Sequence, residues 1–150
     1  MIRLSGTLAE WLLALPLGAV FIYASFDKIL DPAAFARIVY HYQLIGPSRV
    51  IGPLPANLLA VTLPWVELLA GLLLASGFWR REAAALSALM LAVFLVAVGA
   101  ALARGIDIEN CGCFSVTEQG RRAGAQLLVA DAGLLAAALY LARPRAPADR

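Results

Sequence analysis

The stretch Ala83 to Ala103, AAALSALMLAVFLVAVGAALA, decides the fold class of this chain. It contains no Asp, Glu, Lys or Arg. A helix needs about 20 mostly apolar residues to cross about 30 Å of bilayer hydrocarbon, and this stretch reaches that length. The stretch therefore predicts a transmembrane helix.

Three further stretches of similar length and character surround the first. They run from about residue 7 to 26, from 57 to 79 and from 123 to 142. We therefore predict an all-α fold, an integral membrane four-helix bundle that forms a single domain over residues 1–142. The first span is expected to be a retained helix rather than a cleaved signal peptide. Residues 143–150, with two prolines, are expected to form a disordered tail.

Composition supports a membrane protein and excludes other classes. Hydrophobic residues make up 62% of the 150 residues and charged residues 15%, against about 45–50% apolar and about 25% charged in ordinary soluble domains. A soluble fold of this size could not bury so much apolar surface. The formal net charge is only +2 and no basic run is present, which argues against nucleic acid as a partner and leaves the lipid bilayer.

The long connection between the first two spans has a pattern of its own. Five apolar residues recur there near helical spacing: Phe35, Ile38, Val39, Tyr42 and Ile45. The segment is too short to cross a bilayer. We predict an amphipathic segment in this first long loop, either an interfacial helix or a cap over the bundle.

The distribution of basic residues does not decide the orientation. One side of the predicted bundle carries six of them, Arg3, Arg80, Arg81, Arg143, Arg145 and Arg150, and the other side carries Lys28, Arg37, Arg49, Arg104, Arg121 and Arg122. The positive-inside rule counts Lys and Arg near the spans, and here it counts six against six. Orientation therefore has to be argued from chemistry.

The chemistry centres first on Cys111 and Cys113, the two cysteines of the chain, in the connection before the fourth span. Two virtual bonds of about 3.8 Å keep their Cα atoms within about 7 Å, and a disulfide requires about 4.4–6.8 Å. A bridge across Gly112 is possible but strained, and strained exposed disulfides tend to be labile and oxidising. We favour redox chemistry over binding of a soft ion such as Cu(I) and over an inert pair. A structural zinc site needs four ligands, so no metal is expected.

Two carboxylates fall inside predicted spans. Glu67 lies near the middle of the second span and Asp131 in the fourth. An ionised, unpaired carboxylate there would cost roughly 2.5–3.5 kcal/mol, so each should face the bundle interior, be paired or be protonated. Lys28 and Arg37 are the candidate partners of Glu67, and Gln126 is the polar residue near Asp131. Both a proton relay and a structural ion pair remain open for Glu67, whereas a structural role is favoured for Asp131.

Several segments resemble a known family. Ser25-Phe26-Asp27-Lys28-Ile29-Leu30-Asp31-Pro32 and Glu67-Leu68-Leu69-Ala70-Gly71 resemble segments of DoxX-like membrane proteins. Asn110-Cys111-Gly112-Cys113-Phe114 is more specific, and resembles the methylamine utilisation protein MauE branch. The resemblance implies a four-helix protein of the bacterial inner membrane that acts with a periplasmic thioredoxin-like partner in maturing an exported, disulfide-containing client.

These observations lead to one interpretation and two rivals. We interpret the chain as a membrane thiol–disulfide oxidoreductase or its electron-transfer subunit, with Cys111, Cys113 and Glu67 as catalytic residues and the cysteine loop in the periplasm. The resemblance also implies likeness to small membrane subunits that pass electrons to quinone. If a quinone is the acceptor, Lys28, Trp65 and Glu67 would contact it. The rivals are a non-catalytic membrane scaffold and a small-molecule or metal carrier lined by Glu67 and Asp131. Whether the chain is itself an enzyme stays open.

Overall fold

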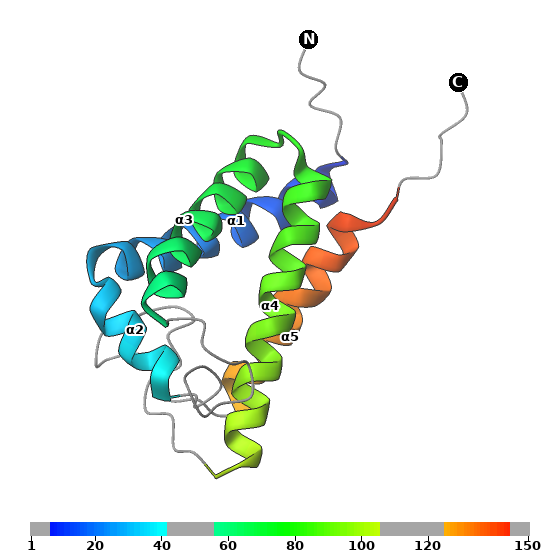
Figure 1. The fold of residues 1–150 in the computed structure, drawn as a ribbon. Helices are drawn as coiled ribbons and strands as arrows, with labels where there is room; N and C mark the ends of the chain where they lie inside the picture. The colour runs from blue at the N-terminus through cyan, green and yellow to red at the C-terminus, as the bar shows by residue number, and fades with distance from the viewer. Residues whose placement is uncertain (1–6, 42–55, 106–124, 145–150) are drawn as a thin grey trace.

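The computed structural model describes residues 7–41, 56–105 and 125–144. These residues form helices joined by turns (Figure 1). The helices are α1 (Leu8–Leu30), α2 (Pro32–His41), α3 (Ala56–Ser76), α4 (Arg80–Ala103) and α5 (Ala125–Ala142). The predicted all-α class is confirmed.

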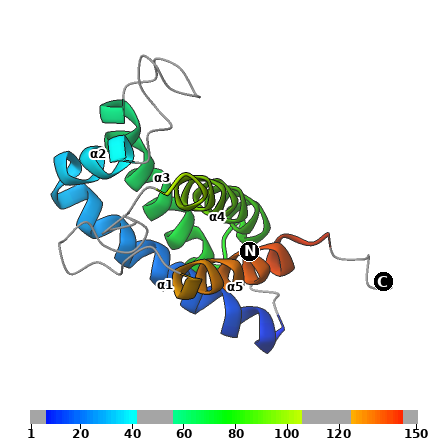
Figure 2. The same ribbon diagram turned by 90° about the horizontal axis from the view of Figure 1, so that it is seen from below.

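The bundle consists of two helix pairs. Figures 1 and 2 show α3 beside α1 and α5 beside α4, with α2 at the outer end of the first pair. A continuous apolar core joins the two pairs, and it includes Leu17 and Phe21 of α1, Leu74 of α3, Leu91 of α4 and Ala138 of α5. The buried charged residues discussed below come from both pairs, Lys28 from α1, Glu67 from α3 and Asp131 from α5.

The helices α1 and α3 touch at two glycines. A Cβ atom on Gly18 would lie 2.8 Å from the carbonyl oxygen of Gly71, and one on Gly71 would lie 2.9 Å from the carbonyl oxygen of Gly18. The two backbones are therefore in direct contact, and neither position leaves room for a side chain. Small residues permit this approach where lipid provides no hydrophobic drive for helix association.

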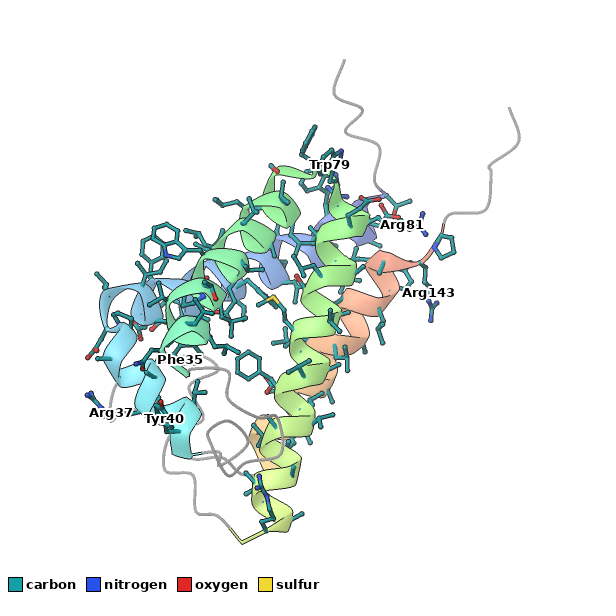
Figure 3. All side chains as sticks on the ribbon, in the orientation of Figure 1. Phe35, Arg37, Tyr40, Trp79, Arg81 and Arg143 are labelled. Atoms are coloured by element: carbon teal, nitrogen blue, oxygen red, sulfur yellow. The ribbon has the colours of Figure 1, made fainter. Side chains whose placement is uncertain are left out.

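The short helix α2 covers one end of α3. The side chain of Asp31 accepts a hydrogen bond from the Ala34 backbone N–H at 2.8 Å, and Pro32 occupies the first turn, where its missing N–H costs nothing. Figure 3 shows Phe35 directed toward the bundle and Arg37 and Tyr40 directed away from it. The predicted amphipathic segment is thus a helix that caps the bundle, although Tyr42 and Ile45 lie outside the described residues.

The opposite end of the molecule gathers the two described termini and the α3–α4 turn (Figure 1). This turn requires left-handed backbone at Gly77 (φ 75°) and at Trp79 (φ 47°). The guanidinium of Arg80 lies 3.8 Å from the centre of the Trp11 ring, and Arg81 Nε donates to the Ala142 carbonyl at 3.2 Å. Residues at the start of α4 therefore contact both α1 and α5 at this end.

Large apolar side chains cover the outside of the helices. Exposed examples occur on every long helix, among them Leu12, Leu69, Leu72, Val96 and Val129. The helices α1, α3 and α4 are each long and apolar enough to cross a bilayer. The chain is therefore a multi-pass membrane protein.

The predicted span boundaries can be compared with the helices. The first span was expected to end at residue 26, but α1 continues to Leu30 and carries Lys28 inside the helix. The second was expected to reach residue 79, but α3 ends at Ser76. The predicted number of four spans is not confirmed, because within the described residues α5 offers only a shorter apolar stretch, Leu128–Ala142.

Candidate functional site

The most unusual feature of the interior is an ion pair between Lys28 and Glu67. Lys28 Nζ lies 2.8 Å from both carboxylate oxygens of Glu67. The Lys28 side chain is fully buried and that of Glu67 is 4% exposed. Because α1 and α3 pack so closely at their glycines, a residue near the end of α1 reaches the middle of α3.

Two aromatic rings cover the lysine. Lys28 Nζ lies 5.1 Å from the centre of the Phe35 ring and 5.3 Å from the centre of the Phe94 ring. These distances are within the range of cation–π attraction, which is strongest where water is excluded. Phe35 comes from α2 and Phe94 from α4, so three helices besides α1 hold one ammonium group in place.

A second carboxylate lines a cavity together with Glu67. Asp131 of α5 is 1% exposed. Asp131 and Glu67 both line a cavity of about 30 Å³ whose other walls are Val20, Phe21, Ala24, Leu91 and Phe94. A water molecule needs about 10–15 Å³ of such space and polar partners to occupy it. The two carboxylates supply those partners, so the cavity can hold water.

The structure decides between the two partners expected for Glu67. Lys28 is the partner, and Arg37 lies on the exposed face of α2 (Figure 3). The expectation that Glu67 faces the interior and is paired is met in the geometry. Whether the pair serves function or only structure is not decided by the pairing itself.

Trp65 does not join Lys28 and Glu67. Its side chain is 58% exposed, whereas Glu67 is buried. Residues two apart in a helix are separated by about 200° around its axis, so the two side chains leave α3 on different faces. The structure therefore does not bring the Trp65 ring together with the Glu67 carboxylate.

The structure does not describe the side chains of the remaining predicted site residues. Cys111 and Cys113 lie outside the described residues, as does the side chain of Gln126. The contact between Phe35 and Lys28 was not predicted from the sequence. The local signal was an aromatic residue on the apolar face of a capping helix, but its contact with Lys28 depends on how that helix packs.

The fold and the buried site define the class of protein: an all-α, multi-pass membrane protein with a charge pair and a second carboxylate enclosed between its helices. In a comparison with protein families, the family model of methylamine utilisation protein MauE matches residues 7–143. The chain belongs to this family, because the match covers all of the described helices. The wider DoxX-like resemblance stays a prediction. Searches of curated proteins and of solved structures each found no match.

Proposed function

We propose that this chain is a membrane thiol–disulfide exchange protein of the bacterial inner membrane, which serves a periplasmic thioredoxin-like partner and its exported, disulfide-containing client. The observation that carries the proposal is the family match across residues 7–143, which encloses Cys111 and Cys113. A chain with two cysteines, two positions apart, has the composition of a single redox pair rather than of a disulfide framework. The methylamine pathway is the setting that the family name suggests.

The proposed exchange is balanced between the two proteins. A thiolate of one protein attacks a disulfide sulfur of the other and forms a mixed disulfide, and the released thiolate takes a proton. The second thiol of the attacking protein then attacks the mixed disulfide and releases the other protein. The disulfide has thereby passed to the attacking protein, and the other protein leaves with two thiols. Neither Cys111 nor Cys113 is assigned as the attacking residue.

Glu67 is proposed to handle a proton in this process. A carboxylate at this depth is expensive to maintain, which makes an ionisable residue within a membrane helix a candidate functional group. The ammonium group of Lys28 lies 2.8 Å from this carboxylate, so it compensates the negative charge that forms when Glu67 loses its proton. The pair therefore suits a group that changes protonation state without opening to solvent.

We keep a quinone as the proposed electron acceptor. Of its predicted contacts, the structure brings Lys28 and Glu67 together at 2.8 Å. Trp65 leaves α3 on a different face and is 58% exposed, so the proposed acceptor site beside the pair does not include its ring.

The count of basic residues stays even when burial is considered. Lys28 is enclosed in an ion pair, and Arg80 at the other end is also paired and only 11% exposed, so leaving out both gives five against five. The proposed orientation therefore rests on chemistry. We propose cytoplasmic termini and a periplasmic loop at residues 104–122, where an oxidising compartment permits disulfides.

A trapping experiment tests the proposal. Cys111→Ser and Cys113→Ser variants, expressed in cells of the native host, should differ, with one of them accumulating a mixed disulfide with a thioredoxin-like protein on non-reducing gels. The double serine variant is the matched control and should trap nothing. In addition, a membrane-impermeant maleimide should label Cys113 of the Cys111→Ser variant in intact cells. Labelling only after the inner membrane is opened, with a thiol that reacts in detergent, would place the loop in the cytoplasm and overturn the proposal.

The carrier alternative gains one specific observation. Glu67 and Asp131, which this alternative required to line a common site, do line one cavity. Its space of about 30 Å³ is large enough for water or an ion. A carrier should keep its activity in the double serine variant, whereas the proposed exchange protein should lose it. A scaffold should also keep it, and should in addition tolerate Glu67→Gln.

A further inference from the structure

Three ionisable side chains are buried among the residues whose burial the structure describes, and they surround a common space. Lys28 comes from α1, Glu67 from α3 and Asp131 from α5. The helix α4 faces the same space with Leu91 and Phe94, and α2 covers Lys28 with Phe35. Every helix of the described bundle thus contributes to enclosing these three groups.

Water in this cavity can form hydrogen bonds with the carboxylates of Glu67 and Asp131. Its volume of about 30 Å³ exceeds the space that one water molecule needs. The other described residues that line the cavity have carbon side chains, which offer water no hydrogen bond. Among the described side chains, the two carboxylates are therefore the hydrogen-bond partners of water in the cavity.

Lys28 is held differently from the two carboxylates. Its ammonium contacts both Glu67 oxygens and lies between the Phe35 and Phe94 rings. Its side chain is fully buried and does not line the cavity. Lys28 therefore acts as a fixed positive charge, while the two carboxylates face the water.

We propose that water in this cavity transfers a proton between Glu67 and Asp131, so that the two carboxylates titrate as one coupled unit beside the fixed charge of Lys28. In each transfer the O–H bond of one carboxylic acid breaks, a water molecule passes a proton on, and an O–H bond forms at the other carboxylate. The inference rests on the proton role proposed for Glu67 and adds Asp131 as its exchange partner. It does not depend on the cysteines.

Infrared spectroscopy of the full chain in lipid nanodiscs tests the coupling. The carbonyl stretch of a protonated carboxylic acid is followed as pH is varied, and is assigned with Glu67→Gln and Asp131→Asn. We expect removal of either carboxylate to move the titration midpoint of the other by about one pH unit or more, the size expected for interacting sites. The band should also shift rapidly in D₂O, because the water exchanges.

Filling the cavity provides the sharper variant. Ala24 lines the cavity and is 5% exposed. Ala24→Leu, or the milder Ala24→Val, should remove the coupling while both carboxylates remain. Ala85→Leu, on an exposed face of α4, is the matched control and should leave it unchanged.

Three results would overturn the inference: independent titration of Glu67 and Asp131, coupling that survives in a folded cavity-filled variant, or midpoints that follow the sodium concentration at constant ionic strength. The last would indicate a cation site instead. Repeating the titration in the Cys111→Ser/Cys113→Ser variant separates this inference from the redox proposal. Coupling should persist in this variant, and failure of both single serine variants to trap a partner would remove only the redox proposal.

Discussion

Two ion pairs in this protein each join a basic side chain to a glutamate, but they lie in different surroundings. Lys28 and Glu67 meet at 2.8 Å in the middle of the bundle, with side chains 0% and 4% exposed. Arg80 and Glu10 approach at 3.8 Å at the end that carries the termini, with side chains 11% and 17% exposed. The first pair has two aromatic rings and a cavity around it, and the second has the Trp11 ring.

The difference shows which pair the fold depends on. In a medium of low dielectric constant the loss of one partner leaves an isolated charge, and the cost is large because water cannot replace that partner. At the end of the bundle, headgroups and water can solvate either partner alone. The central pair should therefore be required for the fold, and the peripheral pair should be nearly dispensable.

Removing one member of the central pair gives the largest expected effect. Glu67→Leu leaves the Lys28 ammonium buried without its carboxylate and should lower the free energy of unfolding by about 3–5 kcal/mol. Glu67→Gln keeps shape and hydrogen bonding and should cost less, while impairing function. Unfolding in mixed micelles of mild detergent and SDS gives both values.

A double variant provides the control for this prediction. Lys28→Met combined with Glu67→Leu removes both charges and should recover most of the lost stability, since a buried pair can be replaced by apolar residues at little cost. If Glu67→Leu alone were as stable as the unmodified protein, the central pair would be no more important than the peripheral one.

The sequence predicted the helices better than it predicted the contacts between them. The uncharged stretch 83–103 lies within α4, because length and apolar character act locally. The first span was predicted to end near residue 26, because Asp27 and Lys28 look like the end of a span, whereas the helix α1 continues to Leu30. A lysine can remain inside that helix only because its partner, 39 residues away, meets it in the fold.

The site was accessible from sequence only in part. Burial cost alone indicated that Glu67 needs a partner and named Lys28 as one of two candidates. The convergence of Glu67 and Asp131 on one cavity depends on the packing of α5 against the rest of the bundle, which no local pattern encodes. The separation of Trp65 from Glu67, in contrast, follows from helix periodicity and could have been foreseen.

The crossing that brings the central pair together should show an intermediate effect. Gly71→Ala places a Cβ atom 2.9 Å from the Gly18 carbonyl oxygen, and backbone cannot move aside as a flexible side chain can. Forcing α1 and α3 apart should lower the free energy of unfolding by about 1–3 kcal/mol, as overpacking does elsewhere. The same micelle titration measures it.

Gly133→Ala is the matched control for the crossing. Gly133 lies in α5, and a Cβ atom there has no neighbour within 4 Å among the described residues. Alanine also favours the helix more than glycine does. The control should be neutral or slightly stabilising, and an equal loss from both variants would mean that glycine content, rather than the close crossing, is responsible.

Removing one partner of the peripheral pair, Arg80 and Glu10, should give the smallest effect. The size of this loss tests whether the peripheral pair matters less to stability than the central pair. Glu10→Gln removes the carboxylate charge but leaves Arg80 stacked at 3.8 Å on the Trp11 ring. The longer separation of 3.8 Å and the partial exposure of both side chains make this pair weaker than the central one, so the loss should be well below that of Glu67→Leu and should shrink as the salt concentration rises. Trp11→Leu removes the stacking surface as well and should cost more, with little dependence on salt. Thermal unfolding of both variants in detergent at low and high salt separates these contributions. A loss from Glu10→Gln that matches that of Glu67→Leu would show that burial does not distinguish the two pairs.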